Sequence, residues 1–432
     1  NPELNAYLEV YDDVLEQAKM ADQKIAEGQS HPLLGIPLAV KDNILIKGKK
    51  LTAGSKILKG YIAPYDATVI GKLKKSGAVF LGRTNMDEFA LGSSTENSAY
   101  GVTRNPYDKS RVSGGTSGGS AASVASSLSL GALGTDTGGS IRQPSAFCGV
   151  VGLKPTYGAV SRNGLIAAVS SFDQAGAIGK TVEDVEIIFN VIKGKDALDS
   201  ATFVDKTYSK LKKEKLKIGL PWDLINQDGI EAVVKKNFEE AVKKLEELGF
   251  KMKNIKLPNC LALYYIINFA EVSSNLSRFD GMKYGLHIEG KDLLDDYLKT
   301  RGEGFGLEAR RRILLGTFVL SAGYYEAYYG TAQKGRAVLK EQFKEIFSEV
   351  DLILTPTTPT PAWKIGEKSD PLSMYLSDIF TIPANLAGVP AMSLPSGFIN
   401  VSGKNLPLGI QFMASHGGED LLFEVGKRFL GQ

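Results

Sequence analysis

The sequence predicts an α/β fold, and two patterns support this prediction. Short apolar runs of the kind that form buried strands alternate along the chain with segments whose apolar residues recur at helical spacing. The central third, about 92–179, is rich in Gly and Ser but is interrupted by apolar segments, which indicates close backbone packing and not a flexible linker. Because no repeat or clear linker divides the 432 residues, we predict one domain spanning 1–432.

The spacing of apolar residues predicts the first helices and strands of the chain. Residues 6–27 carry apolar side chains at helical spacing and predict a helix. Residues 34–40 predict a short apolar strand that ends directly before Lys41. A helix over 68–76 and a strand over 78–81 follow. This succession is the β/α rhythm that defines the predicted fold class.

The second half of the chain continues this rhythm. The basic run 210–217 predicts a solvated linker face and not a binding patch, and it precedes an apparent strand at 218–220. Residues 229–248 have the pattern of an amphipathic surface helix that ends at Gly249. The other predicted elements are strands over 250–257, 351–354 and 408–412 and a final helix over 420–429.

The composition argues against several classes of function. Lys and Arg number 51 against 48 Asp and Glu, so charge alone predicts no nucleic-acid-binding surface. No apolar run is long enough to span a bilayer, so we expect no membrane association. Two cysteines fit a reducing compartment and are too few for a disulfide framework or a thiolate metal site. The three histidines are far apart in sequence, so no metal site is predicted, and spacing neither favours nor excludes a Ser-His-Asp triad.

Two Gly- and Ser-rich clusters, 113–120 and 134–142, hold the candidate chemistry. Each places hydroxyl groups in a backbone with few Cβ atoms, where N–H groups can turn towards a ligand. N–H donors beside a Ser are what acyl transfer needs to stabilise the oxygen that becomes negative. Neither cluster has the Lys of a phosphate-binding loop, and neither fits a dinucleotide fingerprint. From spacing alone, acyl chemistry and a plain structural turn remain equally open.

Lys41 is the candidate base for a serine nucleophile. It ends an apolar strand, and burial there would lower its pKa because desolvation disfavours the charged amine. A Lys after a strand is more often an ordinary surface residue, and the sequence alone does not distinguish the two cases.

The two clusters resemble the signature of a known family. The runs Gly-Gly-Thr-Ser-Gly-Gly-Ser and Gly-Thr-Asp-Thr-Gly-Gly-Ser-Ile-Arg-Gln-Pro-Ser, with the later Phe-Cys-Gly-Val-Val-Gly-Leu-Lys-Pro-Thr, are similar to the amidase signature family. The resemblance covers nearly the whole chain. It implies an amidase signature fold, with a mixed central sheet covered by helices on both faces. It also implies that a helical segment ahead of Asn1 is missing from this sequence, which begins with neither an initiator Met nor a signal sequence.

The resemblance assigns three catalytic roles. In the family the nucleophile is the last Ser of the second cluster, which is Ser140 here. The bridging hydroxyl, which follows a cis peptide bond in the family, belongs to Thr116, and the base is Lys41. The spacing of the three residues agrees with the family's. Thr116 departs from the usual Ser: it keeps the hydroxyl, but its methyl group restricts χ1 and can alter the aim or speed of proton transfer.

The resemblance also implies an oxyanion site made by backbone N–H groups. These belong to Thr137, Gly138, Gly139 and Ser140, at the end of the second cluster.

Within the family, the chain resembles the branch formed by the A subunits of the glutamyl-tRNA(Gln) amidotransferases. The stretches that carry this likeness are 85–90, 273–281, 311–318 and 323–329. In that branch Arg312 would hold the α-carboxylate of free glutamine, Asp378 its α-ammonium, and Tyr264 would complete the pocket. A zwitterion needs one fixed cation and one fixed anion, and Arg grips a carboxylate in bidentate fashion. Without the resemblance, Arg312 and Asp378 would be read as surface charges and Tyr264 as a core residue.

The resemblance implies a glutaminase that hydrolyses L-glutamine through an acyl-Ser intermediate and delivers ammonia to a partner subunit. That partner would use ATP and Mg to amidate Glu-tRNA(Gln) or Asp-tRNA(Asn), so no cofactor is expected in this chain. The expected assembly is a heterotrimer with subunits B and C, in which mischarged tRNA contacts mainly the partner. The expected location is cytoplasmic or an organellar matrix. Two alternatives remain: a stand-alone amidase acting on another small amide, and a catalytically silent assembly subunit.

Overall fold

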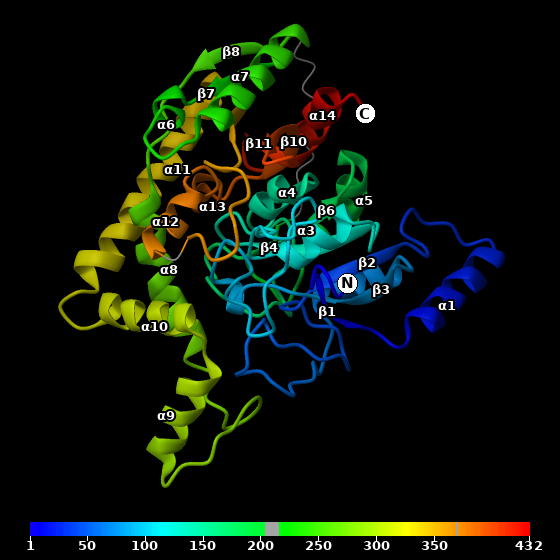
Figure 1. The fold of residues 1–432 in the computed structure, drawn as a ribbon, viewed down its shortest axis with the longest axis vertical. Helices are drawn as coiled ribbons and strands as arrows, with labels where there is room; N and C mark the ends of the chain where they lie inside the picture. Colours follow the sequence, from blue (N-terminus) through cyan, green and yellow to red (C-terminus); the bar gives the residue numbers. More distant parts are fainter. Residues whose placement is uncertain (204–215, 369) are drawn as a thin grey trace.

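A mixed sheet runs through the computed structural model, which describes residues 1–203, 216–368 and 370–432 (Figure 1). Its eleven strands within these residues are β1 (Tyr7–Val10), β2 (Pro37–Lys41), β3 (Val79–Thr84), β4 (Gly131–Asp136), β5 (Val151–Lys154), β6 (Gln174–Gly179), β7 (Lys217–Leu220), β8 (Lys251–Asn254), β9 (Leu352–Pro356), β10 (Ala391–Val401) and β11 (Lys404–Ala414). They lie in the order β1-β3-β2-β4-β6-β5-β10-β11-β9-β7-β8. β2 is parallel to β3 and β4, and β7 is parallel to β8 and β9, whereas the other pairs are antiparallel. The α/β class predicted from the sequence is confirmed.

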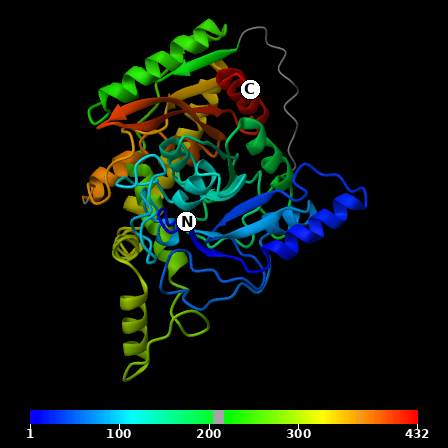
Figure 2. The same ribbon diagram turned by 45° about the vertical axis from the view of Figure 1, so that its right-hand side comes forward.

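Helices pack on both faces of this sheet. They are α1 (Val14–Ala26), α2 (Thr68–Lys75), α3 (Gly118–Ala125), α4 (Arg142–Cys148), α5 (Val182–Ile192), α6 (Trp222–Ile225), α7 (Ala232–Glu247), α8 (Leu261–Leu276), α9 (Leu293–Gly304), α10 (Leu307–Leu320), α11 (Thr331–Glu349), α12 (Pro371–Tyr375), α13 (Ile382–Ala387) and α14 (Glu419–Leu430). Successive strand residues point to opposite faces. In β2, Leu38 and Val40 belong to a large core cluster with side chains of α2 and α5, whereas Ala39 belongs to a smaller cluster with side chains of α3. Figure 2 shows α7 and α1 at opposite ends of the sheet.

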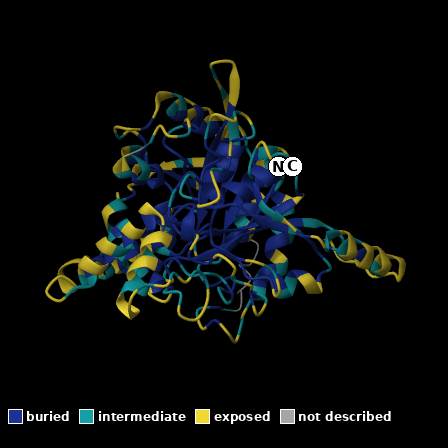
Figure 3. Ribbon diagram, turned by 60° about the horizontal axis from the view of Figure 1, so that its bottom comes forward, coloured by how far each residue is buried: buried dark blue, intermediate teal, exposed yellow. Residues whose placement is uncertain are grey.

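Glycines allow the central segments to approach closely. A Cβ at Gly119, in the first turn of α3, would lie 2.5 Å from the carbonyl oxygens of both Ala6 and Asn85. Because no side chain fits there, α3 packs directly against neighbouring backbone. The Gly- and Ser-rich third of the chain is therefore tightly packed, as the sequence predicts, and Figure 3 shows buried residues concentrated at the centre of the molecule.

The helices α8 and α10 pack against each other and bring the second half of the chain to the site. A Cβ at Gly316 of α10 would clash with the carbonyl oxygen of Phe269 in α8, so this contact requires Gly. α9 projects from the rest of the molecule (Figure 1). Tyr264 of α8 and Arg312 of α10 are both buried.

Among the described residues, the predicted helices and strands overlap observed ones, and the main difference lies at the N-terminus. Residues 6–27 do not form one helix: β1 precedes α1, because the backbone from Tyr7 to Val10 pairs with β3 and Tyr7 enters the core. The run 210–217 lies almost wholly outside the described residues. The sequence made no prediction for helices α3 to α6 and α8 to α13 or for strands β4 to β6 and β10. The remaining predictions overlap observed elements, namely β2, α2, β3, β7, α7, β8, β9, β11 and α14.

Two features are absent from the part of the chain that the structure describes. No helix there has both the length and the apolar character needed to cross a bilayer. No group of three or more His, Cys, Asp or Glu side chains in the same residues is arranged to hold a metal ion.

Candidate active site

Lys41 lies at the end of β2 and is fully buried. Its Nζ is 2.6 Å from Thr116 Oγ1 and 2.8 Å from Ser117 Oγ. It is also 2.9 Å from Thr135 Oγ1, a residue of the neighbouring strand β4. Burial lowers the pKa of Lys41 to about 7, against the opposing influence of nearby carboxylates, the largest that of Asp87. The amine therefore has a substantial neutral fraction near neutral pH and can act as a base.

Thr116 lies just before α3, and its peptide bond with Gly115 is cis. The side chain is fully buried and its hydroxyl contacts Lys41. The next residue, Ser117, donates its backbone N–H to the carbonyl oxygen of Ser140 at 3.0 Å. This bond ties the first Gly-Ser cluster to the second and brings Thr116 and Ser140 into the same site.

Ser140 lies in the turn between β4 and α4. It is 7% exposed, and its hydroxyl has no hydrogen-bond partner among the described residues. A buried hydroxyl that still reaches solvent and is not tied to a protein acceptor can approach a substrate. The role of nucleophile that the resemblance assigns to Ser140 stays a prediction.

Asp136, at the end of β4, fixes the turn that carries Ser140. Its carboxylate accepts the backbone N–H groups of Gly139 and Ile141 at 2.9 and 3.2 Å. Arg142 forms a two-point ion pair with it, at 3.0 and 2.9 Å, within a fully buried environment. Burial opposes ionisation of Asp136, but the charge of Arg142 outweighs it and holds the pKa well below its usual range. The turn is therefore rigid before any substrate binds.

The predicted oxyanion donors differ from the structure at one position. The N–H of Gly139 donates to Asp136, so it is not directed at a substrate. The N–H groups of Thr137, Gly138 and Ser140 have no acceptor among the described residues. Three of the four predicted donors thus remain available, and the fourth holds the turn in place.

The turn also contacts the predicted substrate pocket directly. A Cβ at Gly138 would clash with the hydroxyl oxygen of Tyr264, so only Gly permits this contact. Gly139 has φ of 134° and packs against Thr381, whose hydroxyl donates to the Gly138 carbonyl. Phe172 stacks on Tyr264, with ring centroids 5.4 Å apart. Tyr264 therefore lies directly beside the nucleophile turn.

Arg312 projects from the buried face of α10. Its Nε donates to Glu308 at 2.8 Å and its Nη1 to Asn268 at 3.0 Å, whereas its Nη2 has no acceptor among the described residues. Asn268 in turn donates to the Tyr264 hydroxyl at 3.3 Å. Burial disfavours the charge on Arg312, but Glu308 outweighs it and holds the pKa above its usual range. Arg312 is a fixed cation whose Nη2 group is left for an anion.

Asp378 is the corresponding fixed acid. Its carboxylate accepts the Tyr265 hydroxyl at 2.9 Å and the Ser93 hydroxyl at 3.0 Å. The Arg312 guanidinium lies over the ring of the same Tyr265, 5.6 Å from its centroid. Burial raises the pKa of Asp378 to about 7, against the hydrogen bonds from Tyr265 and Ser93. One tyrosine therefore joins the predicted cation and the predicted anion.

The residues that support this site were not predicted from the sequence. Glu308 precedes Arg312 by one helical turn, a spacing that favours an ion pair and could have been noticed. Ser93 and Tyr265 contact Asp378 from distant parts of the chain, and no sequence pattern links the three. The missed supporting residues are Ser93, Ser117, Thr135, Asp136, Arg142, Tyr265, Asn268 and Glu308.

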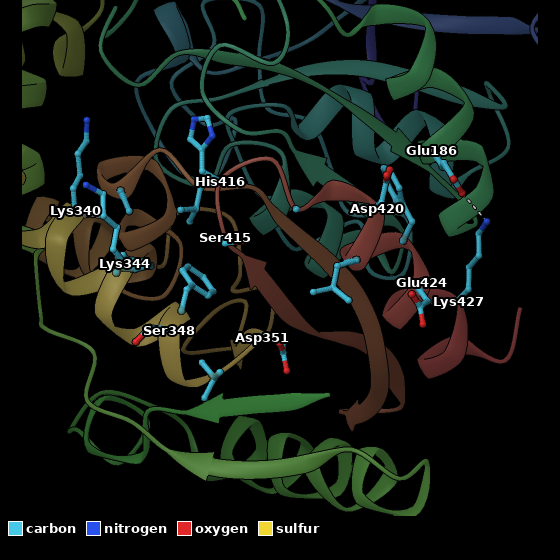
Figure 4. Close-up of a pocket in the computed structure, with 18 residues that line it drawn as sticks. Glu186, Lys340, Lys344, Ser348, Asp351, Ser415, His416, Asp420, Glu424 and Lys427 are labelled. Carbon is cyan, nitrogen blue, oxygen red and sulfur yellow. Dashed lines mark hydrogen bonds and ion pairs between the residues drawn. The ribbon is translucent and has the colours of Figure 1, made fainter. Parts of the chain in front are cut away.

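A separate cleft of about 1160 Å³ opens between α11 and α14 and reaches Glu186 of α5 (Figure 4). Lys340 and Asp420 lie on its sides, and Lys427 pairs with Glu186 at 2.6 Å across one end. None of the predicted site residues lines it. The cleft is therefore not the place where the hydroxyl groups and Lys41 meet.

A buried Lys in contact with a Thr hydroxyl, beside a turn that holds Ser140 and free backbone N–H groups, is the arrangement expected of a serine amidase that uses Lys as its base. Comparison with known proteins agrees with this class: the model of the family described as Amidase matches residues 1–423. The chain belongs to the amidase family.

Individual proteins similar to this chain show which branch of the family it resembles. The A subunit of glutamyl-tRNA(Gln) amidotransferase from Carboxydothermus hydrogenoformans is 53% identical, over 99% of this chain and 90% of that protein. The solved structure of the A subunit of glutamyl-tRNA(Gln) amidotransferase from Thermotoga maritima is 44% identical, with a TM-score of 0.80 over 99% of this chain and 87% of that one. The native peptide amidase from Stenotrophomonas maltophilia is 30% identical, with a TM-score of 0.81 over 100% of this chain and 89% of that one. Within its family, the chain resembles the A subunits of these amidotransferases.

Proposed function

We propose that this chain is the glutaminase subunit of a tRNA-dependent amidotransferase. The observation that carries the proposal is the buried cation Arg312 and the buried carboxyl group of Asp378, joined through Tyr265 beside the Ser140 turn. L-Glutamine is a zwitterion with a reactive side-chain amide, so it matches both the charges and the nucleophile. A simple amide has no zwitterion to hold and leaves the two buried charges without purpose. Relatives about half identical to this chain are A subunits of glutamyl-tRNA(Gln) amidotransferases, which supports the proposed place in such a complex.

In the proposed acylation step, neutral Lys41 accepts the Thr116 hydroxyl proton while Thr116 takes the proton of Ser140. The Ser140 oxygen attacks the side-chain carbonyl carbon of glutamine. The carbonyl oxygen becomes negative and is stabilised by the backbone N–H groups of Thr137, Gly138 and Ser140.

In the steps that follow, the bond between carbon and nitrogen breaks. The leaving nitrogen takes the proton back from Lys41 through Thr116 and departs as ammonia. The glutamyl group remains as an ester on Ser140 until water, activated by the same base, hydrolyses it to glutamate. The site therefore needs no cofactor for its own chemistry.

Ammonia from this reaction would pass to a partner subunit. We propose that subunits B and C complete a heterotrimer, and that ATP and Mg²⁺ are used by the partner that amidates Glu-tRNA(Gln) or Asp-tRNA(Asn). The exposed face of α10 supports a docking partner: Leu307, Leu314 and Phe318 are 67%, 71% and 47% exposed. These side chains lie on the helix that carries Arg312 on its other face. Exposed apolar stripes of this kind are typical of protein interfaces.

The test is ammonia release from L-glutamine by the purified chain, alone and with subunits B and C. We expect release that increases in the complex and is abolished by Ser140→Ala, a variant that still assembles. Turnover of another small amide without turnover of glutamine would contradict the proposal. An unchanged rate in Ser140→Ala would remove Ser140 from the role of nucleophile.

A further inference from the structure

The Lys41 amine is surrounded by more hydroxyl groups than the proposed reaction uses. Besides Thr116, its Nζ contacts Ser117 Oγ at 2.8 Å and Thr135 Oγ1 at 2.9 Å. A neutral amine has two hydrogens to donate but one lone pair with which to accept. Proton transfer from Ser140 requires that lone pair to face Thr116. The backbone carbonyl oxygen of Thr135, 3.3 Å from Nζ, can only accept from the amine. The direction of the lone pair therefore depends on whether the other two hydroxyls donate to Nζ or accept from it.

Ser117 is held in this acceptor state by the backbone. Its hydroxyl donates to the carbonyl oxygen of Thr135 at 3.1 Å, so its proton is already committed. Its lone pairs are left for one N–H of Lys41. This leaves Thr135 as the hydroxyl that can compete with Thr116 for the lone pair.

Asn43 is the residue that decides the direction of the Thr135 hydroxyl. Its side-chain amide is 3.0 Å from Thr135 Oγ1, and the residue is 3% exposed. One end of this buried amide has no partner among the described residues in either orientation: the carbonyl oxygen when Nδ2 faces Thr135, and Nδ2 when the oxygen does. What the orientation decides is whether the Thr135 hydroxyl has an acceptor other than Lys41. With Nδ2 towards Thr135, the only acceptor among the described residues for the Thr135 hydroxyl proton is the lone pair of Lys41. Thr135 and Thr116 then compete to donate to that lone pair.

Exchanging the two ends of the Asn43 amide removes this competition. The oxygen and nitrogen of a side-chain amide have nearly the same shape, and the hydrogen-bond pattern decides between them. With the oxygen towards Thr135, the hydroxyl proton has an acceptor at 3.0 Å, and the Thr135 lone pairs face Lys41. The amine then has acceptors for both of its hydrogens, and its lone pair is left for Thr116.

We propose that Asn43 is a positioning residue whose carbonyl oxygen accepts the Thr135 hydroxyl proton and thereby directs the Lys41 lone pair to Thr116. Asn43 touches neither substrate nor reacting atoms and acts only through Thr135. The inference deepens the proposed function, because it concerns the base of that reaction. It assigns a chemical reason to the Asn that follows Lys41 and Asp42 at the end of β2.

The test compares Asn43→Asp, which can only accept at this position, with Asn43→Leu, which is of similar size but can neither accept nor donate. The measured quantity is the rate at which a fluorophosphonate modifies Ser140 across a pH series. In this reaction the Ser140 oxygen attacks phosphorus, fluoride leaves, and the serine proton passes through Thr116 to Lys41. No recognition of glutamine is needed.

We expect Asn43→Leu to lower the modification rate about tenfold or more at every pH. Asn43→Asp should shift the acid limb of the profile to higher pH, because a carboxylate near Lys41 favours the ammonium form. Above that limb its rate should return to within about fivefold of the parent chain. The proposal would be overturned if both variants lost the same fraction of the modification rate and the acid limb of the pH profile did not move. An unchanged modification rate in Asn43→Leu would overturn it as well.

Thr135→Ser and Thr135→Val give a second pair if Asn43→Leu does not fold, as judged by its thermal unfolding. Ser keeps the hydroxyl and should react at nearly the parental rate, whereas Val keeps the shape and should lose about tenfold or more. Equal rates for Ser and Val would overturn the proposal. A parent chain that reacts with the fluorophosphonate but releases no ammonia from glutamine would contradict the proposed function and leave these comparisons intact.

Discussion

At the scale of single residues, the site depends on a lysine whose charge is made costly by burial. Lys41 is enclosed by hydroxyl groups and not by a carboxylate in direct contact. Hydroxyls stabilise the ammonium less than a carboxylate would, so desolvation dominates and the pKa falls to about 7. A chain with three histidines can therefore obtain a base at neutral pH from an amine.

This environment predicts the pH dependence of the reaction. The rate of Ser140 modification by a fluorophosphonate should rise with pH through about 7 and then level, because only neutral Lys41 accepts a proton. For glutamine, kcat/KM should fall more steeply below pH 7, since Asp378, with a pKa of about 7, must also be ionised to hold the α-ammonium. Stopped-flow measurements give the pH dependence of Ser140 modification, and steady-state assays give that of kcat/KM for glutamine. A flat profile between pH 5 and 9 would exclude Lys41 as the base.

The bridging hydroxyl gives a second prediction at this scale. Thr116→Ser should react at a rate within about threefold of the parent, because the hydroxyl at 2.6 Å from Lys41 is retained. Thr116→Val removes it and should lower kcat about 10²–10⁴-fold, the range attributed to general acid–base catalysis. Glutaminase assays of both variants test this expectation. Activity of Thr116→Val close to that of Thr116→Ser would show that proton transfer follows another route.

At the scale of elements, the position of α10 depends on one buried acid. Glu88 accepts the backbone N–H of Gly306, just before α10, at 2.8 Å, and contacts the Ser55 hydroxyl at 2.5 Å. Burial raises the pKa of Glu88 to about 7, against these hydrogen bonds. The start of the helix that carries Arg312 is thus fixed to the N-terminal half of the chain.

Replacement of this acid by an uncharged side chain should alter stability in a pH-dependent way. Burial raises the pKa of Glu88 in the folded chain from 4.5 to about 7. Between these two pH values the folded chain therefore keeps a proton on Glu88 that the unfolded chain has released. The free energy of unfolding falls as the pH rises through this window. Glu88→Gln does not titrate. The unfolding free energy of the variant relative to the parent should therefore increase from pH 5 to pH 8, on the order of 1–3 kcal/mol. Urea unfolding at both pH values measures this, and a constant or decreasing difference would contradict it.

The agreement between sequence and structure differs between elements for physical reasons. Lys41, Thr116 and Ser140 each lie in a motif that resembles the family's, so the resemblance could place them in one site, and the structure brings Lys41 into contact with Thr116 and the Ser117 N–H into contact with the Ser140 carbonyl. The prediction of one helix over 6–27 was wrong because apolar residues at Leu8 and Val10 fit both helical spacing and a strand, and pairing of β1 with β3 decided between them.

Other parts of the site leave no local signal. The partners of Asp378, Ser93 and Tyr265, come from separate segments, and only the packing of α8 against the nucleophile turn brings them together. The engagement of the Gly139 N–H by Asp136 depends on side-chain orientation and likewise could not be predicted from the motif.

At the scale of the whole molecule, the exposed face of α10 is the expected docking surface for the partner subunits. Leu314→Glu introduces a charge where the side chain is 71% exposed, so it should not disturb the fold. It should weaken association with subunits B and C about tenfold or more, because a charge would be desolvated in the interface. Leu15→Glu, on α1 at the opposite side of the molecule and 75% exposed, is the matched control (Figure 1). Titration by calorimetry compares the two, and equal binding would place the interface elsewhere.

The most direct test of the proposed chemistry is to trap the acyl intermediate. The chain is mixed with L-glutamine in the presence of its partner subunits, quenched with acid after milliseconds to seconds, and analysed by intact-mass and peptide mass spectrometry. We predict a glutamyl ester on the peptide that contains Ser140, with its accumulation abolished by Ser140→Ala and slowed by Lys41→Met. Glutamine turnover without any acylated Ser140, or with the acyl group on another residue, would contradict the assignment of Ser140 as nucleophile.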